Sequence, residues 1–153
     1  MSLLRRQALA VPLAVAVAGN AEAQTGWIVV RDVDNVFLVD MPGTPTYKVI
    51  DTATPAGTPF VYHSYSLEYR RLAFVAQTAL YPAGFDVSQP RLNLQGVLDD
   101  RAQRLEGGKW SKTDWRQVQG APGVESIGPI AGGKALRQLV LLKGHRYVSL
   151  GYL

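Results

Sequence analysis

The chain has 153 residues, no cysteine and a formal net charge of +4 at neutral pH. Without cysteine it cannot form disulfides, thiolate metal sites or c-type haem attachments, and it has no cysteine nucleophile. Its basic residues are spread along the chain instead of lying on one stripe, so we expect no nucleic-acid partner.

The first 23 residues have the layout of a cleavable export signal. Two arginines precede an uncharged apolar run (residues 8–19), and the Ala-Glu-Ala of residues 21–23 has small residues where a signal peptidase reads. A membrane-spanning helix needs roughly 20 apolar residues, whereas this run is about a dozen long and contains Pro12. We therefore predict cleavage after Ala23. The sequence is compatible with export by either the general secretory route or the twin-arginine route.

Residues 24–153 then have the length of one domain. We predict a periplasmic or secreted location for this domain, without stable membrane insertion after the signal is removed. Since it has no cysteine, it must be stabilised by its hydrophobic core alone.

The first half of this domain predicts short strands separated by turn residues. The expected strands are residues 27–31, 36–41, 46–54, 60–69 and 72–81. Pro42-Gly43 ends the second strand, and Arg70-Arg71 joins the two longest strands as a hairpin.

The periodicity then changes to that of a helix. Hydrophobic residues recur at three- and four-residue spacing, namely at Leu94, Val97, Leu98, Ala102 and Leu105. We predict a helix from Gln89 to Glu106, with Ser88 as its N-cap and Gly107-Gly108 as its end.

Strands resume in the last third of the chain. They are expected over residues 110–119, 124–130, 135–143 and 146–152. Strands, one helix and further strands predict an α+β fold, in which an antiparallel sheet carries the helix across one face.

Catalytic patterns in the sequence are incomplete. Val124 replaces the first glycine of a nucleophile elbow around Ser126. The segment 128–135 nearly matches a phosphate-binding loop, but Ala135 replaces the Ser or Thr, and a predicted strand follows instead of a helix. A small periplasmic hydrolase that uses Ser126, or a carboxylate, with His63 or His145 stays as the alternative function. We predict no metal and no cofactor, since the two histidines sit in a strand and in a turn.

Four aromatic residues are the candidate ligand-binding residues. Tyr62 and Tyr65 fall on opposite faces of strand 60–69, so both faces are expected to pack and one has rings available for a ligand. Trp110 and Trp115 are interleaved with cations, a mix that can bind nucleic acid, glycans or lipid headgroups. Their spacing on one strand predicts opposite faces, with one indole in the core and one at the rim.

The run from Asp34 to Pro45, DNVFLVDMPGTP, resembles the opening of small exported bacterial proteins of unknown function, with Met41 at their aromatic position. The tyrosine-rich hairpin, the central helix and the closing hairpin with Arg137 also look similar. That group resembles PsbP-like domains, which implies an antiparallel sheet sandwiched by helices and supplies no catalytic residues. Such domains usually end in a helix, whereas this sequence ends at Leu153 in a predicted strand, so the C-terminal helical layer is expected to be missing.

From these observations we expect a non-catalytic domain of the cell envelope that binds a protein partner or a small ligand.

Overall fold

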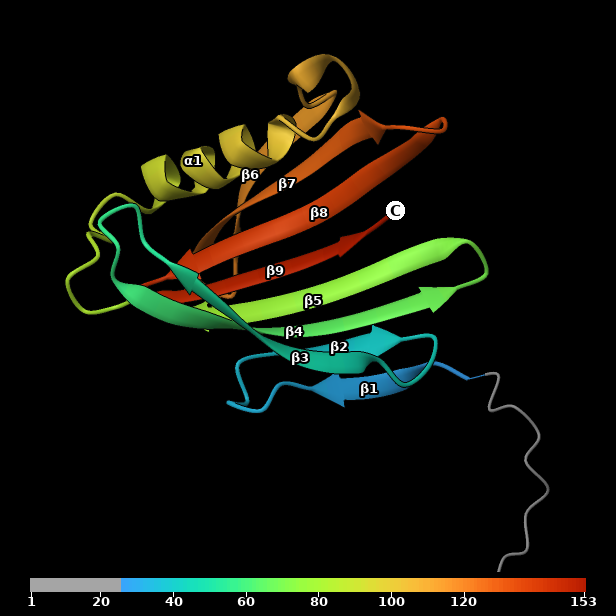
Figure 1. Ribbon diagram of the computed structural model, residues 1–153, viewed down its shortest axis with the longest axis horizontal. Helices are drawn as coiled ribbons and strands as arrows, with labels where there is room; N and C mark the ends of the chain where they lie inside the picture. The colour runs from blue at the N-terminus through green and yellow to red at the C-terminus, as the bar shows by residue number, and fades with distance from the viewer. Residues whose placement is uncertain (1–25) are drawn as a thin grey trace, which may run out of the picture.

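The computed structural model describes residues 26–153, so the predicted export signal lies outside the described residues. Its main element is a seven-stranded antiparallel sheet with the strand order β3-β4-β5-β9-β8-β7-β6 (Figure 1). In chain order these strands are β3 (Thr46–Ala53), β4 (Pro59–Tyr69), β5 (Leu72–Leu80), β6 (Lys112–Val118), β7 (Ala121–Ile130), β8 (Lys134–Lys143) and β9 (Arg146–Tyr152).

Three further elements complete the fold. The strands β1 (Ile28–Arg31) and β2 (Leu38–Met41) form a separate hairpin. The helix α1 (Pro90–Ala102) and the short 3₁₀ turn η1 (Glu106–Gly108) connect β5 to β6. The predicted α+β class, with an antiparallel sheet and one helix packed on it, is therefore confirmed.

The chain crosses the sheet once. After β5 it passes through α1 to β6 at the far edge, and β7, β8 and β9 then return strand by strand until β9 pairs with β5. Along this route α1 packs against β7 and β8. The first and last parts of the domain thus meet at the centre of one sheet.

Side chains on the two faces of the sheet form two separate cores. On the face that carries α1, Leu94 and Leu98 of the helix pack against Val124, Val140 and Leu142. The opposite core consists of Val30, Met41, Tyr65 and Ala76, with further apolar residues of β1 and β2 around it. Among residues 26–153 the second face is therefore covered by a β hairpin, where the PsbP-like resemblance implied a helix.

Local details of the helix differ from the prediction. The α-helix ends at Ala102, four residues before the predicted end, and Gly107 (φ 72°) turns the chain away. Its N-cap is Gln89 without a side-chain hydrogen bond, while the Ser88 N–H donates to the Asp86 carboxylate. Leu105 is still buried against the core, which explains why the apolar periodicity continues past the helix end.

One buried hydrogen-bonded cluster attaches the β1–β2 hairpin to the sheet. The carboxylate of Asp32, only 2% exposed, accepts the backbone N–H groups of Asp34 and Val36 and the hydroxyl of Tyr65 at 3.3 Å. The Tyr65 oxygen in turn accepts the Val33 N–H at 2.8 Å. Since Tyr65 belongs to β4, its hydroxyl joins the hairpin loop to the main sheet.

The replacement Tyr65→Phe tests this attachment. It leaves the Val33 N–H and one Asp32 oxygen without their partner inside the protein, so we expect the free energy of unfolding to fall by about 1–3 kcal/mol. Urea denaturation measures this change, with Tyr69→Phe in the same strand as the matched control. The double variant Tyr65→Phe with Asp32→Ala is expected to lose less than the sum of the single losses, because the partners share one bond. Additive losses contradict the coupling.

Candidate binding cleft

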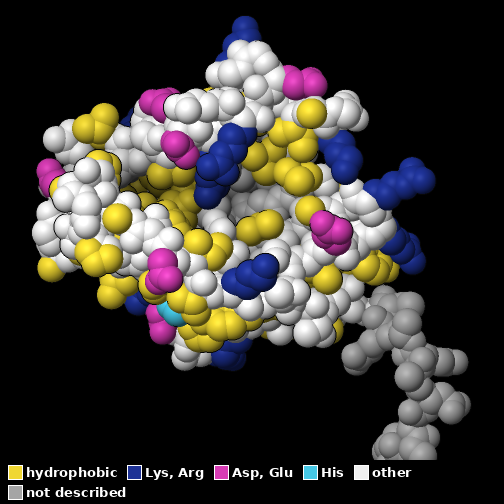
Figure 2. All heavy atoms as spheres, viewed as in Figure 1, with side chains coloured by type: hydrophobic (Ala, Val, Ile, Leu, Met, Phe, Trp, Pro, Cys, Tyr) yellow, Lys and Arg dark blue, Asp and Glu magenta, His cyan; other side chains and the backbone are white. Residues whose placement is uncertain are grey.

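The helix α1 covers only part of its face of the sheet and leaves a cleft beside it. A cavity of about 670 Å³ lies between α1 and the β3–β4 end of the sheet. A smaller cavity of about 230 Å³ adjoins it, because Gln77, Arg101 and Arg104 line both. We call the two together the α1 cleft. Figure 2 shows it as a hollow below the helix, with basic side chains at its mouth and hydrophobic ones inside.

Aromatic rings form one wall of the α1 cleft. They come from β4, β9 and the end of β5 with the loop behind it, and they are Phe60, Tyr62, Tyr81, Phe85 and Tyr147. Neighbouring centroids in this group are 4.6–5.9 Å apart, mostly tilted or edge to face. Such contacts hold each ring in place. The wall is therefore a preformed, largely apolar surface.

A buried polar cluster forms the floor of the cleft. The Arg101 guanidinium of α1 donates to Gln138 Oε1, to Ser149 Oγ at 3.0 Å and to Tyr147 Oη at 2.8 Å. Gln138 Nε2 donates to the hydroxyl of Ser126 at 3.0 Å. These residues come from α1, β7, β8 and β9, so the cluster joins the helix to three strands.

The charge of Arg101 is not neutralised by this cluster. Among residues 26–153 no carboxylate lies within 4 Å of its guanidinium, and its three hydrogen-bond partners are neutral. The acidic residues that line the cleft, Asp51 and Asp100, are exposed. A half-buried cation without a counter-ion is energetically costly, so the site favours an anion.

The phenols beside Arg101 are neutral at physiological pH. Burial raises the pKa of Tyr147 to about 12, with the Arg101 charge acting in the opposite direction. Burial also raises the pKa values of Tyr62 and Tyr81, again opposed by Arg101. The floor of the cleft thus carries one fixed positive charge among uncharged hydroxyl and amide groups.

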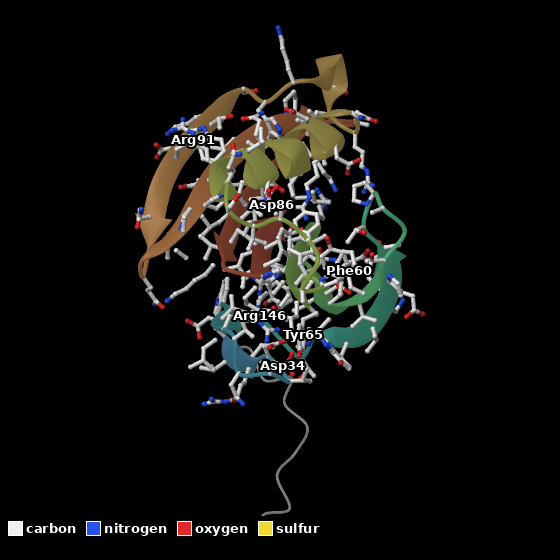
Figure 3. All side chains as sticks on the ribbon, turned by 90° about the vertical axis from the view of Figure 1, so that its left-hand side faces the viewer. Asp34, Phe60, Tyr65, Asp86, Arg91 and Arg146 are labelled. Atoms are coloured by element: carbon white, nitrogen blue, oxygen red, sulfur yellow. The ribbon has the colours of Figure 1, made fainter. Side chains whose placement is uncertain are left out.

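The structure separates the two tyrosines predicted to bind a ligand. Tyr62 lines the α1 cleft, whereas Tyr65 is buried on the opposite face near the β1–β2 hairpin. In Figure 3 Phe60, on the same face as Tyr62, lies on the α1 side of the sheet, and Tyr65 lies lower, with Asp34 and Arg146. The expectation that both faces of this strand pack is confirmed.

The two tryptophans pack against the core under α1. Trp110 donates its Nε1–H to the Leu98 carbonyl at 3.0 Å, and the Arg91 guanidinium lies 4.6 Å from the centre of the Trp115 ring. They lie on the same side of the sheet, contrary to the prediction, because β6 begins at Lys112 and Trp110 precedes it. Of the four candidate residues, only Tyr62 lines the α1 cleft. A binding role for the other three stays a prediction.

The polar floor is not evident from the sequence. Its only local signal is a polar residue at an inward position of an otherwise apolar strand, as with Gln138 in β8 and Ser149 in β9. Such positions require buried partners. The partner Arg101 lies 37 and 48 residues away in sequence, so only the folded chain shows the cluster.

The candidate hydrolase residues lie apart. Ser126 is fully buried under α1, and its hydroxyl accepts the Gln138 bond. His63 points to the opposite face, where its Nδ1 lies 2.7 Å from Tyr47 Oη. Four strand spacings separate β4 from β7, about 19 Å. His145 lies in the turn between β8 and β9. The structure therefore brings neither histidine to Ser126.

The described part of the chain, residues 26–153, lacks two features. Within this range no three His, Asp or Glu side chains gather as a metal site would require. The same range contains no helix with the length and hydrophobicity needed to cross a bilayer.

A second groove of about 500 Å³ lies on the opposite face, between the β1–β2 hairpin and strands β6–β8. It is lined mainly by apolar residues, among them Trp27 and Phe74. Its charged residues differ from those of the α1 cleft, because Glu125 forms ion pairs with both Arg116 and Arg137. Hydrogen bonding from Arg137 lowers the pKa of Glu125.

Comparisons with protein-family models, with curated proteins and with solved structures gave no match for this chain. The resemblance to PsbP-like domains therefore stays a prediction, and the function has to be inferred from the α1 cleft itself.

The raised pKa of Tyr147 predicts a pH-dependent stability. Its pKa is about 12 in the folded protein and about 10 when exposed, so its contribution is complete below pH 10 and is lost as the pH rises through 12. We expect the urea midpoint to fall over this range, and to fall less steeply in Tyr147→Phe. In a pH titration followed by tyrosinate absorbance, the rise at the highest pH is expected to be smaller in Tyr147→Phe than in the wild type. It is expected to be unchanged in Tyr152→Phe. Equal late phases in both variants contradict the prediction.

Proposed function

We propose that this protein is an exported, non-catalytic binding domain that holds a small, largely apolar ligand in the α1 cleft. The supporting observation is the cleft itself, whose larger cavity of about 670 Å³ has a continuous aromatic wall. Ligand pockets commonly measure about 300–1,000 Å³ and combine apolar walls with a few placed polar groups. The location in the periplasm or outside the cell rests on the predicted export signal.

Exposed hydrophobic side chains at the rim support the same proposal. Ile50 of β3 and Leu92 of α1 both line the larger cavity, with 42% and 63% of their surfaces exposed. A ligand bound between them removes this apolar surface from water, which is favourable by about 25 cal/mol per Å². The walls come from a helix and strands, so the site needs little ordering on binding.

The chemistry of the cleft favours binding over catalysis. Its phenols are neutral, and the hydroxyls of Ser126 and Ser149 already hold hydrogen bonds within the floor. A nucleophile needs an adjacent base, and the nearest residues to Ser126 in this cluster are an amide and a guanidinium. The alternative of a hydrolase gains no support from this arrangement.

Gly96 offers a way to fill the cleft without disturbing the core. It lines the larger cavity on the exposed side of α1, and a Cβ atom added there meets no other atom within 4 Å. Gly96→Trp therefore places a large ring in the cleft. Gly96→Ala is the matched control, and it is expected to raise the free energy of unfolding by about 1 kcal/mol through helix propensity.

The test measures fluorescence of the neutral apolar dye phenylnaphthylamine with the purified exported protein. We expect saturable binding to the wild type and to Gly96→Ala, and a loss of affinity of about tenfold or more in Gly96→Trp, because one ring excludes the other. Absence of saturable binding to the wild type contradicts the proposal. So does equal binding to Gly96→Trp, since a dye in the groove on the opposite face does not contact Gly96.

A further inference from the structure

We propose that the ligand of the α1 cleft is an amphipathic monoanion, of the class of medium-chain or aryl carboxylates, whose acid group lies between Arg101 and Arg104. This inference rests on the proposed function and adds the charge and polarity of the ligand. Four features of the cleft support it.

The first feature is the hydrogen-bonding capacity left on Arg101. A guanidinium has five N–H donors in a fixed plane. Three of them bond to Gln138, Ser149 and Tyr147. Two donors remain on a side chain that lines both cavities. A carboxylate accepts such charged N–H donors more strongly than a neutral alcohol does.

The second feature is the way in which Arg101 is held. Its neutral partners fix the orientation of the guanidinium and leave its charge uncompensated. Arg116 and Arg137 on the opposite face differ, since both bind Glu125. Because Arg101 is half-buried and its partners Gln138 and Ser149 are buried, its field is screened less than that of a surface cation. It is therefore the strongest anion-attracting group of the cleft.

The third feature is the composition of the smaller cavity. Arg101 and Arg104 carry the charged side chains of its lining, and no Asp or Glu of the described residues lines it. Most of the rest is apolar and includes Val75, Ile130 and Leu136. The cavity thus has a cationic mouth and an apolar interior, which matches a molecule with an acid group at one end and a hydrocarbon or aryl body.

The fourth feature limits the ligand to one negative charge. Asp51 and Asp100 line the larger cavity from exposed positions. From there they repel a second negative charge at the far end of a ligand, without forming an ion pair with either arginine. A monocarboxylate with an apolar tail therefore fits better than a dicarboxylate or a phosphate dianion.

The experiment compares two dyes that differ by one charge. Anilinonaphthalene sulfonate has nearly the shape of phenylnaphthylamine with an added sulfonate. We expect Arg101→Met to weaken binding of the anionic dye by about tenfold or more, since a hydrogen bond to a charged group is lost. Binding of the neutral dye is expected to stay within about twofold, since its contacts are apolar. Arg104→Met is expected to give a smaller loss of the same kind.

The matched control is Arg91→Met. Arg91 lies on the same helix, but it stacks on Trp115 and does not line the cleft. Its replacement by Met changes the net charge of the protein by the same amount as Arg101→Met does. We expect it to leave the binding of both dyes unchanged. In competition, decanoate is expected to displace the anionic dye from the wild type at lower concentration than decanol does.

The outcomes separate this inference from the proposed function. Neutral-dye binding that responds to Gly96→Trp, with anionic-dye binding unchanged in Arg101→Met, overturns the inference and leaves the function standing. Equal displacement by decanoate and decanol also overturns it. If Arg101→Met fails to fold, the variant Arg104→Met tests the inference instead, because Arg104 is exposed. An equal effect of Arg104→Met on the binding of both dyes overturns the inference. If neither dye binds the wild type saturably, both proposals fail.

Discussion

The pairing of β5 with β9 is the constraint on which the rest of this structure depends. It joins strands that are far apart in sequence, so the chain must cross the sheet between them, and α1 makes this crossing. The helix packs over β7 and β8 and leaves β4, β5 and β9 uncovered beside it. The same register sets Gln77 opposite Ser149 and Ala79 opposite Tyr147. The cleft and its polar floor are thus consequences of one strand pairing.

The polar floor has a cost that a simple apolar core avoids. Gln138 and Ser126 are almost fully buried, and each requires a partner that the other supplies. Arg101 needs more than this, because hydrogen bonds to neutral groups orient a charge without balancing it. We interpret the unbalanced charge of Arg101 as a sign that the cleft accepts an anion. A structural cluster is expected to include its own counter-ion, as Glu125 does for Arg137 on the other face.

The two faces of the sheet are covered in different ways. On one face the β1–β2 hairpin is fastened by Asp32 and Tyr65, which closes a small second core. On the other face α1 leaves a site of ligand size open to solvent. The domain has no disulfides, so its stability depends on buried apolar surface. The core beneath the β1–β2 hairpin adds to this surface, while part of the opposite face stays uncovered. Each face thus has its own core, and the cleft lies beside the core under α1.

The sequence by itself determined the elements of this protein and very little of its site. Strand alternation, the helical period around Leu94 and turn residues are local signals, and they predicted nearly every element; Arg70-Arg71 adopts the left-handed turn of a two-residue hairpin. The strand order and the meeting of Arg101 with Gln138 and Ser149 depend on contacts dozens of residues apart, which only the tertiary structure decided. Local patterns record which face a residue occupies, whereas a site depends on which distant faces come together.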